Sequence, residues 1–130
     1  MRVELRNIHK YFGKNHANAG INLDIRSGTI QGILGENGAG KSTLMKILSG
    51  YFYADSGEII LDGKAITISS PSDAIKHGIG MLHQDPRDFP PMRLLDNFLL
   101  GREGGLFPDR KAVARDIQTL AAQFNFSLDP

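Results

Sequence analysis

The chain has 130 residues, of which 41% are hydrophobic and 22% are charged, a composition that fits one globular domain and excludes a disordered chain. Its net charge of +1 offers no broad attraction to nucleic acid, so we expect no nucleic-acid partner. It contains no cysteine, which excludes disulfides and cysteine catalysis.

The N-terminal residues predict two strands joined by a polar loop. Apolar residues within 3–8 predict a first strand that breaks near Asn7, and alternation over 21–25 predicts a second, half-buried strand. The sequence opens directly on the first strand, so we expect no signal peptide, and no apolar run approaches the ~20 residues of a membrane-spanning helix. The loop carries the adjacent aromatics Tyr11 and Phe12, which either stack on a nucleotide base or pin the loop to the core; the spacing leaves both open.

The motif with the clearest chemistry follows the second strand. Residues 35–43 match the phosphate-binding pattern G-x-x-x-x-G-K-S/T, between an apolar run at 30–34 that predicts a strand and a helical pattern over 43–49. The candidate nucleotide-binding residues of this loop are Gly35, Glu36, Asn37, Gly38, Ala39, Gly40, Lys41, Ser42 and Thr43.

A loop of this kind can bind a nucleoside triphosphate for direct physical reasons. The N-terminus of a helix presents unpaired N–H groups and a partial positive charge to an anion. Gly35, Gly38 and Gly40 lack a Cβ, so the backbone can curl around a phosphate. Lys41 would reach the β- and γ-phosphates, and the Ser42 hydroxyl would hold Mg²⁺.

Residues 58–68 predict a β-hairpin. Two apolar runs flank Asp62 and Gly63, and an Asp-Gly pair favours a tight turn. An apolar strand that ends in Asp also resembles the Mg²⁺-binding strand of many P-loop proteins. The glycine after Asp62 indicates turn chemistry instead, so we assign Asp62 no metal role.

The rest of the sequence predicts short elements separated by loops. Ser70 and Pro71 can begin a helix that Gly78 ends, and a buried strand over 79–82 leads to Gln84.

Beyond Gln84 a proline-rich loop is followed by a helix over 92–100 that Gly101 stops, and Asp109 can cap a last helix. The face of that helix predicted to be buried holds Val113, Ile117, Leu120, Ala121 and Phe124.

In this order the motifs resemble the nucleotide-binding subunit of ABC transporters, over essentially the whole chain. The residues that carry the resemblance are Phe12, the loop at 35–43, Leu48-Ser49-Gly50, residues 55–59 and Gln84. Residues 80–84 and 96–101 look like the importer subgroup that handles simple sugars or nucleosides.

The resemblance implies an α/β fold with a P-loop NTPase (RecA-like) core. An N-terminal antiparallel β subdomain and the P-loop core would occupy residues 1–84. The Q-loop and the beginning of a helical subdomain would occupy residues 85–130.

The resemblance also implies roles for individual residues. Phe12 stands at the adenine-stacking position, and Lys41 and Ser42 keep the roles given above. Gln84 matches the Q-loop glutamine, which contacts Mg²⁺ and the attacking water and couples the site to the membrane subunit; a neutral amide suits this because it both donates and accepts. ATP and Mg²⁺ are therefore the expected cofactors, with Lys41 and Gln84 as catalytic residues and Ser42 and Gln84 as metal ligands.

The implied partners are the transmembrane permease subunits and a second nucleotide-binding domain. The loop over 86–92 would contribute to the surface that docks on the permease. The implied location is cytoplasmic, at the inner face of the cell membrane.

Three further motifs of the family do not occur in these 130 residues: a Leu-Ser-Gly-Gly-Gln signature, a strand ending in Asp-Glu and a switch histidine. We therefore expect a fragment, about half of the family's domain, with very weak ATP hydrolysis. In the family's sheet, strands from the other half lie between the strand before the P-loop and the strand before Gln84. We therefore also expect a truncated fold with open apolar edges.

Three other interpretations stay open. A non-transport ABC-type ATPase, such as a translation factor or a chromosome-maintenance protein, is one; the latter would run into a long heptad coiled coil, which residues 109–126 do not show. A GTPase or small-molecule kinase is another, although the GTPase motifs Asp-x-x-Gly and Asn-Lys-x-Asp are absent. The third is an inactive fragment that binds no nucleotide.

Overall fold

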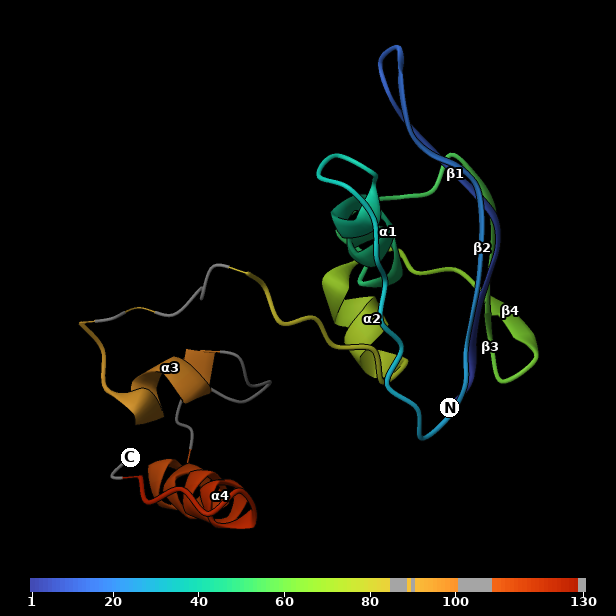
Figure 1. Cartoon of the computed structure of the whole chain (residues 1–130). Coiled ribbons are helices and arrows are strands. Elements are labelled where there is room, and N and C mark those ends of the chain that lie inside the picture. Colours follow the sequence, from blue (N-terminus) through green and yellow to red (C-terminus); the bar gives the residue numbers. More distant parts are fainter. Residues whose placement is uncertain (85–88, 90, 101–108, 129–130) are drawn as a thin grey trace. The chain divides into compact units, whose positions relative to one another are not determined.

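The computed structural model describes residues 1–84, 89, 91–100 and 109–128 (Figure 1). The elements in chain order are β1 (Val3–Phe12), β2 (Asn15–Ile25), α1 (Lys41–Leu48), β3 (Ser56–Leu61), β4 (Lys64–Ile66), α2 (Pro71–Lys76), α3 (Leu94–Leu100) and α4 (Arg110–Gln123). The chain divides after Leu82 into two compact units, just before the boundary expected after Gln84.

The first unit contains an antiparallel sheet with the strand order β2-β1-β3-β4. Helices α1 and α2 lie on one side of this sheet (Figure 1). The core between sheet and helices is made of aliphatic side chains: Val3, Leu5, Ile8, Leu44, Ile47, Leu48, Ile59, Ile68, Ala74 and Ile79. The antiparallel β subdomain expected at the N-terminus is therefore present.

Strand β1 is longer than predicted, because it does not break at Asn7. Asn7 has a left-handed φ of 51°, and the register with β2 shifts between Leu5 and Ile8. A β-bulge of this kind absorbs one extra residue without ending the strand, so Leu5 and Ile8 both face the core. The strand continues to Phe12, so the aromatics predicted for a loop lie on β1 instead.

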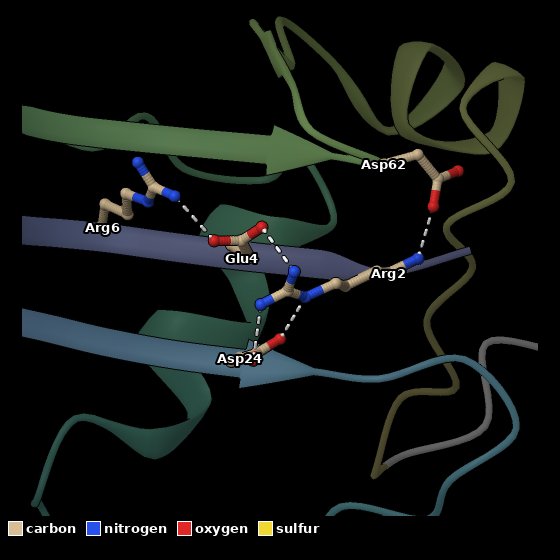
Figure 2. Close-up of polar contacts among 5 residues, drawn as sticks. All are labelled: Arg2, Glu4, Arg6, Asp24 and Asp62. Atoms are coloured by element: carbon tan, nitrogen blue, oxygen red, sulfur yellow. Dashed lines mark hydrogen bonds and ion pairs between the residues drawn. The ribbon is translucent and has the colours of Figure 1, made fainter.

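The opposite face of the sheet carries a set of charged side chains (Figure 2). The Arg2 guanidinium donates two hydrogen bonds of 2.9 Å to Asp24 and lies 3.6 Å from Glu4, which also pairs with Arg6 at 2.9 Å. The Arg2 backbone N–H donates to Asp62 at 2.7 Å. These contacts join β1 to β2 and to the β3–β4 turn, and the hydrogen bonds from Arg2 lower the pKa of Asp24.

The predicted hairpin is confirmed, with β3 and β4 joined through Asp62 and Gly63. Both turn residues have positive φ, 48° for Asp62 and 82° for Gly63, as an Asp-Gly turn requires. Asp62 therefore acts in the turn.

Two predicted strands are wrong. Residues 30–34 and 79–82 form no strand, and Ile30, Leu34 and Leu82 are almost completely exposed. Neither segment has a strand partner among the residues that the structure describes. An isolated strand leaves its N–H and C=O groups unpaired, so apolar sequence alone does not create one. The apolar side chains of these segments are exposed, but because the segments form no strand they are not the open sheet edges that the sequence led us to expect.

The helices of the first unit follow their sequence signals. Helix α1 begins at Lys41, two residues earlier than predicted, and Gly50 follows it with a φ of 76°. Helix α2 has the predicted cap, because the Ser70 hydroxyl accepts a hydrogen bond of 3.1 Å from the Asp73 N–H and Pro71 is the first helical residue.

The second unit contains α3 and α4, which pack on each other. Asp109 caps α4 as predicted, by accepting hydrogen bonds from the N–H groups of Lys111 and Ala112. The buried stripe of α4 is narrower than predicted, because its members recur every fourth residue at Val113, Ile117 and Ala121. Two predicted core residues lie off this stripe and are exposed, Leu120 at 47% and Phe124 at 65%.

Helix α3 begins at Leu94, two residues later than predicted, and Gly101, predicted to stop it, lies outside the described residues. The same is true of most of the predicted docking loop at 86–92. Across the described parts of both units, no helix has the length and apolarity needed to cross a membrane.

Candidate functional site

The loop at 35–40 curls back on itself before α1 begins. The N–H of Ala39 donates to the carbonyl oxygen of Glu36 at 3.2 Å, and a Cβ at Gly35 would lie 3.4 Å from the Cβ of Ala39. The segment is therefore neither extended nor helical. It forms a bend at the N-terminus of α1, which is the arrangement that the motif predicts.

Two glycines in this loop are required by the backbone. Gly38 and Gly40 have φ values of 86° and 82°, in the left-handed region where a side chain is strained. Gly40 also lies close to β2, because a Cβ there would be 2.1 Å from the carbonyl oxygen of Ala17. A Cβ at Gly35 would make only ordinary van der Waals contacts, so the backbone does not require glycine at this position.

Lys41 closes the loop. Its ammonium donates hydrogen bonds to the carbonyl oxygens of Gly35 at 2.7 Å and Glu36 at 2.8 Å. An ammonium has three N–H donors, so one remains for a further acceptor. The arrangement places a positive charge inside the bend and holds the bend in shape.

The beginning of α1 offers further donors. Within the described part of the chain, the backbone N–H groups of Lys41, Ser42 and Thr43 have no acceptor, and the N-cap residue Gly40 has no side chain to supply one. Such N–H groups and the helix dipole favour an anion. The exposed Ser42 hydroxyl lies on the first turn of the same helix. The site can therefore bind a phosphate through backbone donors, an ammonium and a hydroxyl.

The adjacent aromatics Tyr11 and Phe12 have different surroundings. The Tyr11 ring stacks on His16, with a centroid distance of 3.9 Å and an interplanar angle of 11°. The Phe12 ring meets Phe52 edge to face at 5.4 Å and remains 44% exposed. The two rings are exposed to a similar degree; Phe12 is in no parallel stack with a described ring, but the Lys10 ammonium lies over it, 5.6 Å from the centroid.

Asp55 fixes the end of β1 that carries Phe12. Its carboxylate accepts hydrogen bonds from the Tyr11 N–H at 2.6 Å and from the Lys10 ammonium at 3.0 Å. The hydrogen bond from the Tyr11 backbone is the main reason why the pKa of Asp55 is lowered. This contact anchors a residue of the motif at 55–59 to the aromatic end of β1.

Gln84 is exposed and belongs to the second unit, and its role stays a prediction. The described residues contain no group of three or more His, Asp or Glu side chains that could hold a metal ion.

A separate cavity of about 320 Å³ lies between the sheet and α1. Its walls include the apolar residues Ile8, Ile47 and Phe52 and also polar ones such as Glu58 and Thr67. No residue of the phosphate-binding motif lines it. The cavity and the loop at 35–43 are therefore in different places, and we identify the candidate site by the functional groups of the loop.

One buried polar residue beside the loop was missed from the sequence. Asn18 on β2 is 3% exposed and donates from Nδ2 to the carbonyl oxygen of Gly40 at 3.2 Å. Extending the alternation of Ile21 and Leu23 backwards would put position 18 on the outer face. The register with β1 shifts between Ile21 and Asn18, and this shift turns Asn18 inward. The one sequence signal beside that shift is the glycine at position 20, which adopts a left-handed conformation in the structure.

The comparisons with known proteins agree on one family. A family model described as ABC transporter matches residues 19–129. The chain is 44% identical, over 96% of its length, to the ribose import ATP-binding protein RbsA 2 of Escherichia coli O157:H7. It resembles the crystal structure of an ATP-binding cassette of an ABC transporter in its ADP conformation, with a TM-score of 0.79, 28% identity and coverage of 94% of this chain and 54% of that one.

A second solved structure is a dimer of an ATP-binding cassette bound to ADP and phosphate in a post-hydrolysis state. It matches with a TM-score of 0.68 and 25% identity, over 91% of this chain and 55% of that one. The chain spans only 26% of the E. coli relative's length. The family match nonetheless covers most of the chain, and the curled loop, the antiparallel sheet and the helix order fit it. The chain therefore belongs to the ABC transporter family.

Proposed function

We propose that this chain is the phosphate-binding part of an ATP-binding module that energises import of a simple sugar. The observation that carries the proposal is the bend at 35–40, closed by Lys41 and followed by three N–H groups that find no acceptor among the described residues. The similarity to ribose import ATP-binding proteins supports import, and a simple sugar as the solute. The same similarity disfavours a non-transport ATPase.

The residues of the motif fit ATP in a definite way. The N–H groups of Lys41, Ser42 and Thr43 would bind phosphate oxygens together with the backbone of residues 35–40, and the Lys41 ammonium would use its third donor for the terminal phosphates. Phe12 would stack on the adenine, since its ring is still partly exposed. When Mg²⁺ is bound it neutralises phosphate charge, and the Ser42 hydroxyl and Gln84 are the side chains proposed to hold it.

The remaining parts of the proposal concern the whole transporter. The permease subunits and a second nucleotide-binding domain are the proposed partners, and the dimeric cassette among the similar structures supports the latter. The module would then act at the cytoplasmic face of the membrane. The 130-residue chain would bind ATP without sustained hydrolysis, because the signature, the Asp-Glu strand and the switch histidine are not among its residues.

The proposal is tested by titrating a fluorescent ATP analogue into the 130-residue chain in the presence of Mg²⁺. Lys41→Met removes the ammonium that closes the loop and should weaken binding at least about tenfold, since hydrogen bonds to charged groups contribute ~1.5–3 kcal/mol. Lys64→Met is the matched control, because it removes the same charge from β4 and should bind as the wild type does. Equal affinity of wild type and Lys41→Met would show that the loop is not the site.

A further inference from the structure

The Gly40 carbonyl oxygen accepts two hydrogen bonds. The N–H of Leu44 donates at 2.9 Å as the first helical bond of α1, and the Asn18 side chain donates at 3.2 Å from β2. The orientation of the amide follows from chemistry, because the carbonyl is an acceptor and only Nδ2 can donate to it. Asn18 is thus a side-chain link between the sheet and the end of the phosphate loop.

The other end of the same amide has no partner among the described residues. Asn18 Oδ1 is buried and accepts no hydrogen bond from any residue that the structure describes. Almost all buried polar atoms in proteins are hydrogen-bonded, and a buried acceptor without a donor destabilises the folded state. An apolar side chain of the same size would pack here without that cost. The asparagine is therefore explained by the one bond that it makes, to Gly40.

That bond acts directly on the anion site. The Gly40 carbonyl and the Lys41 N–H belong to one planar peptide group, so fixing the direction of the oxygen also fixes the direction of the N–H. The Lys41 N–H is the first of the three at the start of α1 that have no acceptor in the described part of the chain. The link needs a glycine at position 40, because a Cβ there would lie only 2.8 Å from Asn18 Nδ2 and would push the amide away.

We infer that Asn18 is a positioning residue for nucleotide binding, which orients the Gly40–Lys41 peptide toward the phosphates from the neighbouring strand. The inference rests on the proposed function and adds a residue outside the loop motif to it. Asn18 does not touch the nucleotide itself. Its effect is to hold the loop in the conformation that receives phosphate, so that less order has to be created on binding.

The test compares Asn18→Leu with Asn22→Leu in the 130-residue chain. Asn22 lies on the same strand, is exposed and bonds to Asn7 and Gly20, away from the loop. Affinity for the MgATP analogue and the midpoint of thermal unfolding are measured for each. Asn18→Leu should lose affinity about three- to tenfold, the range for one hydrogen bond, while its midpoint stays equal or rises. Asn22→Leu should keep the wild-type affinity.

Three results would overturn the inference. The first is wild-type affinity in Asn18→Leu. The second is a loss of affinity that disappears once the unfolded fraction is subtracted, because Asn18 would then serve packing alone. If Asn18→Leu does not fold, the smaller substitution Asn18→Ala, which cannot clash, must show the same loss of affinity after correction for the unfolded fraction. The third result that would overturn the inference is therefore wild-type affinity in Asn18→Ala. Absence of binding by the wild-type chain would instead refute the proposed function, and the inference with it.

Discussion

Gly40 is required for two reasons, its left-handed backbone conformation and its close approach to β2, and comparing Gly40→Ala with Gly63→Ala separates them. Gly40 has a φ of 82°, and so does Gly63 in the β3–β4 turn. A Cβ at Gly63 would meet nothing within 4 Å, whereas a Cβ at Gly40 would lie 2.1 Å from the Ala17 carbonyl oxygen. The two substitutions therefore share the conformational cost of a left-handed alanine, and only Gly40→Ala adds the collision with β2.

The magnitudes follow from this geometry. Gly63→Ala should cost about 1 kcal/mol for the left-handed conformation alone. In Gly40→Ala the loop and β2 must separate by 0.9 Å to bring the 2.1 Å approach to the 3.0 Å limit of real Cβ contacts. Overpacking of this kind adds ~1–3 kcal/mol, so the total should be about 2–4 kcal/mol.

Urea unfolding followed by circular dichroism measures both variants against the wild type. With equal m-values, Gly40→Ala should show the larger fall in midpoint. Its melting temperature should fall further than that of Gly63→Ala by about 4 °C for each additional kcal/mol. Equal losses in the two variants would refute the close approach between the loop and β2.

Two more predictions concern charge and exposed apolar surface. Asp24 has a lowered pKa because Arg2 donates to it, so its contribution to stability is present above the ordinary value of 3.8 and is lost as pH falls through the lowered folded value. Urea midpoints of wild type and Asp24→Asn should therefore differ at neutral pH and converge as the pH falls through that lowered value; parallel curves would contradict this contribution. Replacing both Ile30 and Leu34 by lysine should reduce light scattering at high concentration and leave the unfolding midpoint unchanged, because both side chains are almost fully exposed. The control variant Ile30→Leu/Leu34→Ile keeps both side chains apolar and should scatter light like the wild type. Unchanged scattering in the lysine variant would argue against aggregation through this segment.

The local features of the chain were readable from its sequence. The Asp62–Gly63 turn, the Ser70 and Asp109 caps and the bend at 35–40 each depend on a few neighbouring residues whose conformational preferences act over one turn. The positions of Lys41 and Ser42 on the first turn of α1 were readable for the same reason, because the loop and that turn are contiguous.

Tertiary structure decided what local preference could not. The bulge at Asn7 and the register shift beside Gly20 depend on pairing between strands, so the extent of β1 and the inward position of Asn18 were not predictable from alternation. The apolar segments at 30–34 and 79–82 match strand patterns, yet they form no strand, since a strand exists only with a neighbour to pair with. The sequence by itself determined the bend at 35–40, and pairing in three dimensions determined which strands form and which side chains support that bend.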